Sequence, residues 1–400
     1  MTVEQALEYA LGHHPLLQAR QHEVEAARAR LITAGLLPNP RFVLNTGSPL
    51  DREGPTDLLG RLEFTILTGG KRRLREAAAE AEIQRTCLAL DRETEQVLAE
   101  AADAAVEVLY LQELARLEAQ LSELAAKTAE IHRDRFKAAQ TTYAATILSA
   151  LDAGNVEMDR LDALGRLELA RVRLSRAVGL PPSERPSVQG QLDVEAVPPV
   201  PLERILAQAE RSRPELAESR AALRESQQRL AVAEADARPD IVIGPRLRTT
   251  LGERGNDMGG RLETDVPVFD RNQGRIAEGA AMVGTSRAMV DVTKIATLSD
   301  VAAAYLELRA TQSRLEFYQT HVRPAADDAE KTIREVRAEE VLTPSRISEL
   351  LEQLVRVRVQ HLDLRSRHDR LRTRLEILLG RPLRELQEAA PAPSAPRPPS

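Results

Sequence analysis

Metal coordination is the chemistry that the histidines of this sequence suggest first. Of the seven histidines, only His13 and His14 are neighbours in the chain. Adjacent residues on a helix point in different directions, so this pair cannot hold one ion well, and we expect a surface or helix-start position for it. The five methionines are scattered, which predicts no thioether ladder for a soft metal. The other histidines are scattered too and predict no metal site: His22, His132, His321, His361 and His368.

The remaining side chains predict no catalytic site. Cys87 is the only cysteine, so it forms no internal disulfide, and its Ala/Leu-rich surroundings predict a buried position in a helix. The 61 acidic and 55 basic residues are interspersed and give a net charge of −6. No basic block or aromatic-basic pattern indicates a nucleic-acid partner. We therefore expect no catalytic residues and no cofactor, and an enzyme is the least favoured class.

Long helices must position these side chains. Aromatic residues make up only 2% of the chain and tryptophan is absent, whereas a thick globular core would use more of them. A chain dominated by Ala, Leu, Glu and Arg is typical of long helices with narrow apolar seams. No run of about 18 apolar residues predicts a transmembrane helix. The start, MTVEQALEYAL, has an amphipathic helical pattern rather than that of a signal peptide, which indicates a cytosolic protein or a leader missing from this sequence.

The sequence contains an internal repeat that covers nearly the whole chain. Residues 4–43 match residues 203–242 without a gap at an offset of 199, including Pro40 with Pro239. The tetrapeptide GRLE at Gly60 recurs at Gly260, an offset of 200. Gly70-Lys71 then corresponds to Gly274-Arg275 at 204, and Gly179 to Gly380 at 201. A third GRLE, at Gly165, has no counterpart in this alignment and is a coincidence.

Each half predicts the same order of elements, and the fold class is mainly α with a small β part. A helix of about 30 residues, with a proline near its start and another at its end, precedes two strands and a long helical hairpin. The two halves are expected to form one interwoven protomer, with a disordered proline-rich tail at 386–400. Repeat 1 is predicted at 1–190, with strands at about 40–48 and 60–67 and a helical hairpin at about 70–179. Repeat 2 is predicted at 200–385, with strands at about 239–251 and 259–268 and a helical hairpin at about 274–380.

The second strand of each half alternates between apolar and charged residues. Leu62, Phe64 and Ile66 would face one way, and Arg61, Glu63 and Thr65 the other; Arg261, Glu263 and Asp265 lie on the corresponding charged face. Such a pattern suits a barrel strand with lipid outside and water inside. Four strands cannot close a barrel, so either they form a small soluble sheet or several chains pool them, and three chains would supply twelve. A soluble coiled-coil scaffold without a transport role therefore stays open as the alternative.

Several motifs of this chain resemble the TolC family of outer-membrane efflux proteins. The segments HHPLLQAR and SRPELAES are similar to the family's Asn-Pro-Glu-Leu segment, and TGGKRRLREAAAEAE resembles the segment at the start of the first hairpin. The segment DVPVFDRNQGRIAEGAA at 265–281 resembles one in the heavy-metal-exporter branch, and Arg135-Phe136 resembles the Arg-Tyr before the periplasmic tip. The resemblance covers residues 3 to about 385.

The resemblance implies a homotrimeric outer-membrane channel that extends into the periplasm. A twelve-stranded β-barrel, four strands from each protomer, would cross the outer membrane and contact its lipid. A trimeric α-barrel would cross the periplasm and dock a periplasmic membrane-fusion adaptor, which joins an inner-membrane RND-type pump. The resemblance to the heavy-metal-exporter branch implies heavy-metal cations as the exported substrate. Arg61, Glu63, Arg261, Glu263 and Asp265 would line the barrel lumen.

The resemblance also implies roles for individual positions along the two hairpins. Counting 40 residues back from Gly179 and Gly380 places the adaptor-contact tips at Ala139-Gln140-Thr141 and Glu340-Val341-Leu342, where the family usually has Val-Gly-Leu. Glu349, assisted by Glu352, would form an acidic ring at the closed periplasmic entrance; the alternative is a solvated helix face. Lys71-Arg72-Arg73, Arg271 and Arg275 would contact lipid headgroups, or are ordinary solvated charges.

Overall fold

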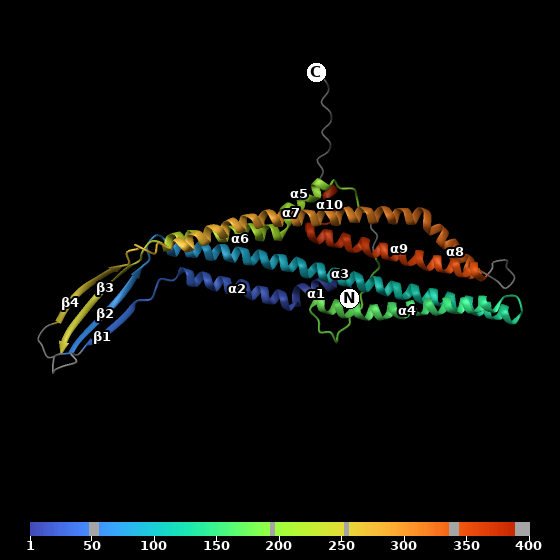
Figure 1. Cartoon of the computed structure of the whole chain (residues 1–400), viewed down its shortest axis with the longest axis horizontal. Helices are drawn as coiled ribbons and strands as arrows, with labels where there is room; N and C mark the ends of the chain where they lie inside the picture. The colour runs from blue at the N-terminus through green and yellow to red at the C-terminus, as the bar shows by residue number, and fades with distance from the viewer. Residues whose placement is uncertain (48–55, 193–196, 252–255, 336–343, 389–400) are drawn as a thin grey trace, which may run out of the picture. The chain divides into compact units, whose positions relative to one another are not determined.

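The computed structural model describes residues 1–47, 56–192, 197–251, 256–335 and 344–388 (Figure 1). It divides into two compact units. The first unit comprises Met1–Gln18, Glu93–Arg213 and Ala296–Ser400, and the second comprises Ala19–Arg92 and Pro214–Ile295. Each unit thus takes segments from both halves of the sequence, while the division into repeats at 1–190 and 200–385 stays a prediction.

The second unit contains a four-stranded antiparallel sheet in the order β1-β2-β3-β4. The strands are β1 (Arg41–Gly47), β2 (Thr56–Ile66), β3 (Ile241–Leu251) and β4 (Asn256–Thr264). Phe42 pairs with Leu62, and Ile243 pairs with both Phe64 and Leu262, so apolar residues stand side by side across the sheet. The prediction of a mainly α chain with a small β part is confirmed. The predicted end of the last strand at 268 is wrong, because the strand stops at Thr264, which pairs with Ile241 at the start of its only neighbour in the sheet, β3.

Helices of the second unit lie beside one another in the same order as the strands to which they connect. They are α2 (Pro15–Gly35), the start of α3 (Lys71–Lys137), α6 (Pro214–Asp236) and the start of α7 (Gln273–Phe317). Arg30 of α2 pairs with Glu82 of α3 at 3.1 Å, and Arg85 of α3 pairs with Glu225 of α6 at 2.5 Å. A Cβ added to Gly279 of α7 would lie 3.1 Å from Leu230 of α6, so these two helices are in close contact. The helix order is therefore α2-α3-α6-α7, with α2 and α7 at the two ends.

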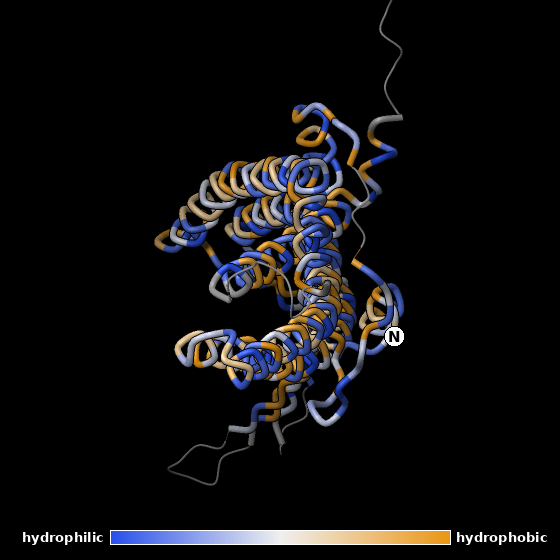
Figure 2. The backbone as a smooth tube through the Cα atoms, turned by 90° about the vertical axis from the view of Figure 1, so that its right-hand side faces the viewer, coloured by the Kyte–Doolittle hydropathy of each residue, from blue (hydrophilic) through white to orange (hydrophobic). Residues whose placement is uncertain are grey.

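The first unit is built from the distal parts of two helical hairpins. The end of α3 returns through α4 (Tyr143–Val178), and the end of α7 continues through a π-helical turn (Tyr318–Val322) and α8 (Arg323–Glu335) to α9 (Pro344–Leu379). Two apolar clusters hold the unit together, one around Leu308, Leu375 and Ile205, the other around Leu121 and Leu354. Figure 2 shows hydrophobic and hydrophilic residues alternating along the helical tubes, as expected for narrow seams. The remaining short helices are α1 (Val3–His13), α5 (Leu202–Ser212) and α10 (Leu383–Glu388).

Prolines break the helices at three points. The predicted helix of about 30 residues at the start of each half is wrong: α1 ends before Pro15 and α5 before Pro214. The residues preceding these prolines, His14 and Arg213, have extended ψ values of 121° and 119°, because a proline disfavours helical geometry one residue earlier. The π-helical turn ends two residues before Pro324, whose missing N–H and bulky ring interrupt regular α-helical hydrogen bonding.

No helix within the described ranges has both the length and the apolar character needed to cross a membrane.

Candidate functional site

The four-stranded sheet carries its apolar side chains on its exposed surface. In β2, the apolar residues Leu62, Phe64 and Ile66 are 36%, 42% and 46% exposed. The side chains of Arg61 and Glu63, which flank Leu62 and lie on the opposite face, are only 24% and 14% exposed. A sheet in water would bury its apolar face and expose its charged one, so this alternation is inverted. The predicted two faces are thus present, and the apolar one has no covering element within the described part of the second unit.

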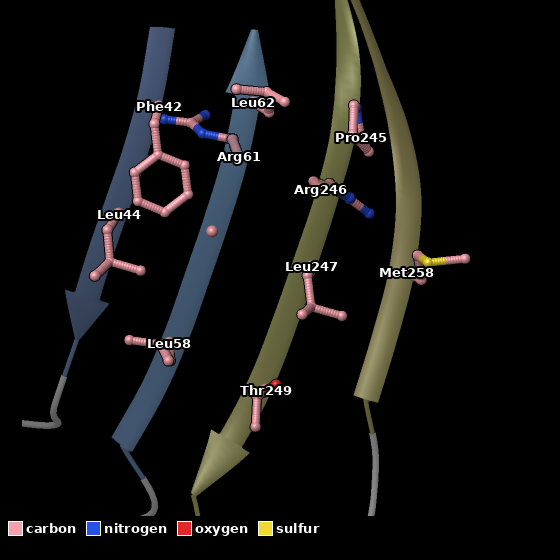
Figure 3. A pocket seen from close by; sticks show the side chains of 11 residues that line it. Phe42, Leu44, Leu58, Arg61, Leu62, Pro245, Arg246, Leu247, Thr249 and Met258 are labelled. Carbon is pink, nitrogen blue, oxygen red and sulfur yellow. The ribbon is translucent and has the colours of Figure 1, made fainter.

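The apolar face extends across all four strands (Figure 3). Phe42 and Leu44 of β1, Leu62 of β2, Leu247 of β3 and Met258 of β4 are all exposed on it. A shallow groove of about 380 Å³ runs over these residues. An exposed apolar surface of this extent indicates a site that contacts a membrane or another protein.

The charged face of the sheet is a network of ion pairs. Arg261 of β4 reaches Glu63 of β2 at 2.5 Å and also pairs with Glu263, while Arg61 lies 3.8 Å from the same Glu63 carboxylate. Four of the five residues predicted to line a lumen are therefore brought together on one face. The fifth, Asp265, follows the end of β4 and lines a separate charged hollow beside Arg275. Sequence alternation placed Asp265 on the strand because it could not locate the strand end.

A partly buried ion pair joins the sheet to the helices. The Lys71 side chain is 5% exposed and its Nζ lies 2.8 Å from Asp240 Oδ1. The backbone N–H of Thr68 donates to the same oxygen at 3.0 Å. The predicted contact of Lys71 with lipid headgroups is wrong, since its ammonium group is enclosed and paired, whereas Arg72 and Arg73 are exposed.

The turn between α3 and α4 contains the first predicted tip. Ala139 has a positive φ of 57°, the left-handed conformation in which glycine is favoured. The Gln140 N–H donates to the Arg135 carbonyl at 2.8 Å and the Ala139 N–H to the Phe136 carbonyl at 2.9 Å, which closes the helix end. Thr141 follows within the turn, and Thr142 caps α4 by accepting the Ala145 N–H.

The sequence did not predict that two exposed aromatic rings lie together at this turn. Phe136 and Tyr143 lie on either side of the tip with ring centroids 5.6 Å apart. The available signal was their rarity, since the chain has only five phenylalanines and five tyrosines. Exposed aromatic side chains are enriched where proteins bind one another.

The second predicted tip, Glu340, Val341 and Leu342, lies outside the described residues. The two glutamates proposed for a constriction lie on the first turns of α9, and both are exposed. Glu352 pairs with Arg356 at 2.7 Å one turn later, which partly neutralises its charge.

His13, His14 and His361 make structural contacts. His14 ends the first helical segment, and its Nδ1 accepts the Leu16 N–H at 3.2 Å, in agreement with a helix-start position. His13 stacks on Tyr9, and His361 stacks on Tyr318 with centroids 4.0 Å apart. Burial, reinforced by Arg365, Arg358 and Arg323, lowers the pKa of His361 to about 4. No group of three or more potential metal ligands occurs in the part of the chain that the structure describes, and Cys87 is half-buried rather than buried.

Comparison with known proteins finds relatives of this sequence and of this fold. The chain is 24% identical over 330 residues to the cobalt-zinc-cadmium resistance protein CzcC of Cupriavidus metallidurans, a match that spans 82% of this chain and 78% of that protein. The crystal structure of CusC, a protein described as forming a transmembrane channel, superimposes with a TM-score of 0.79 at 14% identity, over 95% of this chain and 92% of CusC. The outer membrane protein VceC of Vibrio cholerae gives a TM-score of 0.78 at 17% identity, over 95% and 96%. No family model matches the sequence.

Proposed function

We propose that this chain, whose fold is that of the TolC-like outer-membrane efflux proteins, forms the exit channel of a tripartite efflux system in the outer membrane. The resemblance to that family is confirmed by the structural matches and by the likeness to CzcC. The channel would contain no catalytic residue and no cofactor, because its task is passage rather than chemistry.

The inverted sheet is the observation that carries this proposal. Apolar residues of all four strands lie on an exposed face, and the charged residues lie together on the opposite face. Lipid would cover the apolar face, and water would hydrate the ion-paired face. Backbone groups at the open edges of β1 and β4 cannot stay unpaired in hydrocarbon, so the sheet must be continued by another strand on each side.

Three copies of the chain supply the missing strands. Together they provide twelve strands, enough to close a barrel, as a homotrimer in which β4 of each copy neighbours β1 of the next. Exposed apolar residues on the terminal helix α7 and on α4 support assembly with further copies, because these faces otherwise contact water: Met282, Met289, Val292, Ile147, Leu151 and Met158.

The helical hairpins would extend into the periplasm and meet the other components there. We place the contact with a periplasmic membrane-fusion adaptor at Ala139-Gln140-Thr141 and at Glu340-Val341-Leu342, with Phe136 and Tyr143 beside the first turn. The adaptor would join the channel to an inner-membrane RND-type pump.

Glu349 and Glu352, exposed at the start of α9, would narrow the periplasmic entrance with an acidic ring.

Conductance across a planar lipid bilayer tests the channel function. Protein extracted from outer membranes should insert and produce discrete ion currents. Replacing Glu349 and Glu352 with glutamine should reduce the preference for cations, because the ring would lose its negative charge. Absence of any current from correctly folded, trimeric protein would contradict a channel.

Heavy-metal cations are the substrate class that we favour. The name of CzcC specifies resistance to cobalt, zinc and cadmium, and the likeness to CzcC extends over most of both chains. Deleting the chain from its host should lower tolerance to one or more of these three ions, and the intact chain should restore it. If the deletion left tolerance to all three ions unchanged but increased sensitivity to organic toxicants, the exported substrates would be organic compounds rather than these metal ions.

A further inference from the structure

The chain segments at one end of the sheet differ in chemistry between the interior and the edges of the sheet. Because Arg41 pairs with Glu63, and Ile241 with both Ile66 and Thr264, four connecting segments emerge at this end. We call 67–71 and 237–240 the inner segments, since they connect to the central strands β2 and β3. We call 36–40 and 265–272 the outer segments, since they connect to the edge strands β1 and β4.

Polar contacts fasten the inner segments within one chain. Lys71 and Thr68 both contact Asp240, and the Thr68 hydroxyl donates to the Pro239 carbonyl at 2.5 Å. The same seam continues between α3 and α6, where Arg75 pairs with Asp236 at 3.1 Å and Arg85 with Glu225.

Large apolar side chains occupy the outer segments instead. Leu36 and Leu37 are 63% and 64% exposed, and Phe269 is 92% exposed, with Val266 and Val268 exposed beside it. The edges of a four-stranded sheet are three strand spacings apart, roughly 14 Å, so the two outer segments of one copy cannot cover each other.

The internal repeat shows that this difference is systematic. At the offset of 199, Asp240 corresponds to Arg41, Asp236 to Leu37 and Glu225 to Ala26. At the offset of 204, Lys71 corresponds to Arg275 and Arg85 to Met289. The ion pairs of the inner seam thus have apolar counterparts at the edges, or, for Lys71 and Asp240, two arginines that cannot pair.

The outer segment after β4 is also longer than its inner counterpart. The offset rises from 200 at Gly260 to 204 at Gly274, so this segment has four additional residues, and it contains Val268 and Phe269. The Asn272 side chain holds its end in place by donating to the Ala233 carbonyl at 2.6 Å. The segment also contains Asp265 and Asp270, which are opposite in charge to the exposed Arg41 at the other edge.

We infer that the outer segments meet between copies: Phe269 of one copy packs on Leu36 and Leu37 of the next, and Met289 packs on Ala26. This inference rests on the proposed trimer, in which each β4 edge joins the β1 edge of another copy. A second copy of the chain would cover both outer segments, because a head-to-tail interface brings together two different surfaces. One surface is the segment 265–272 with Phe269, and the other is Leu36 and Leu37 with small, exposed alanines of α2 beside them. Apolar seams between copies then alternate with ion-paired seams within copies.

Cysteine crosslinking tests the contact, since Cys87 is the only native cysteine and is replaced by serine first. The full chain carrying Phe269→Cys and Leu37→Cys, treated in membranes with a short bis-maleimide, should give dimer and trimer bands with loss of the monomer band. The matched control carries Phe269→Cys and Asn45→Cys. Asn45 lies on the same edge strand, roughly 13 Å along the strand from Arg41. The control variant should therefore leave the monomer band unchanged.

Charge exchange supplies an independent test. Met289→Arg alone and Ala26→Glu alone should each reduce the trimer fraction measured by light scattering in detergent, because each puts an unpaired charge into an apolar seam. The double variant should restore the trimer, because it copies the Arg85–Glu225 pair of the inner seam. Failure of the double variant to recover, with helix content intact, would overturn the pairing of these two positions.

The outcomes separate this contact from the channel itself. Trimers of normal mass without the Leu37 crosslink would overturn the contact and leave the proposed channel in place. Monomers in the outer membrane would overturn both. Phe269→Trp would be the only tryptophan in the chain, and quenching of its fluorescence by brominated phospholipid would overturn the contact by placing this side chain in lipid.

Discussion

At the scale of single residues, the Lys71–Asp240 pair joins the two segments that connect the central strands to their helices. Asp240→Asn would keep an acceptor for the Thr68 N–H but leave the enclosed ammonium group without a counter-charge. We expect a loss of roughly 2–4 kcal/mol in the free energy of unfolding, measured by urea denaturation in detergent. Lys127→Ala removes an exposed pair with Glu123 and should cost below about 0.5 kcal/mol. Equal losses for the two variants would show that the junction is not fastened by this pair.

His361 should make stability depend on pH. Its folded-state pKa of about 4 lies below its usual 6.5, so the unfolded chain binds the proton more readily. The contribution of this group is therefore complete above pH 6.5 and is lost as the pH falls from 6.5 towards 4. The cations that oppose its protonation are Arg323, Arg358 and Arg365.

His361→Phe keeps a ring to stack on Tyr318 and removes the titration. The decline in the urea midpoint between pH 6.5 and 4 should become shallower in this variant. His22→Gln, which changes an exposed histidine, should follow the parent curve. A His361→Phe curve parallel to that of the parent would show that another group controls the acid sensitivity.

Residue roles were predictable where local pattern determines them and not where distant segments meet. Alternation along β2 was enough to place Arg61 and Glu63 on one face. The burial of Lys71 depends on Asp240, which is 169 residues away, so a basic run at a strand end looked like a lipid contact. The aromatic pair at Phe136 and Tyr143 needs the α3–α4 turn to bring its rings together.

At the scale of elements, the α3–α4 turn contains an identifiable strain. Ala139 occupies a left-handed position that disfavours a Cβ, so Ala139→Gly should raise the free energy of unfolding by about 0.5–1 kcal/mol. Ala150→Gly, at an exposed position inside α4, should lower it by about 1 kcal/mol. A loss at both positions, measured in the same urea titration, would contradict the helix-end geometry described above.

Element types were predictable because long proline-free runs and clean alternation are strong signals. Element ends were less so. Pro15 and Pro214 each shortened a helix relative to its pattern, since the apolar periodicity continues past a proline while the backbone hydrogen bonds do not. Pro324 was visible in the sequence, and it marks the π-helical turn that distinguishes α7 from the uninterrupted α3.

At the scale of the whole molecule, an added charge should be costly on the apolar face of the sheet and nearly neutral on the charged face. Phe64→Arg places a cation on the apolar face, which should cost roughly 2–4 kcal/mol in lipid and reduce the amount of protein in the outer membrane. Thr65→Arg places the same cation one residue later on the charged face and should leave that amount nearly unchanged. Quantitative blotting of membrane fractions measures both, and equal effects would contradict a lipid-facing apolar surface.

From the sequence, elimination left two options, a small soluble sheet or strands pooled from several chains, and the homotrimer was implied only by the family resemblance. Two strand pairs with one apolar face cannot satisfy their edges alone, and the repeat shows that the chain has only two such pairs. The number of copies and the partner at each edge depend on surfaces in separate chains, which no pattern within one chain encodes directly. The duplicated junction, apolar at the edges and ion-paired inside, is the feature on which the proposed contact between copies rests.

The mass of the protein extracted from the outer membrane of its native host tests the central claim most directly. Light scattering in detergent, corrected for bound detergent, should give an assembly of three chains of 44.1 kDa each, recovered from the outer-membrane fraction. A soluble monomer, absent from that fraction, would contradict the account and favour a helical scaffold instead.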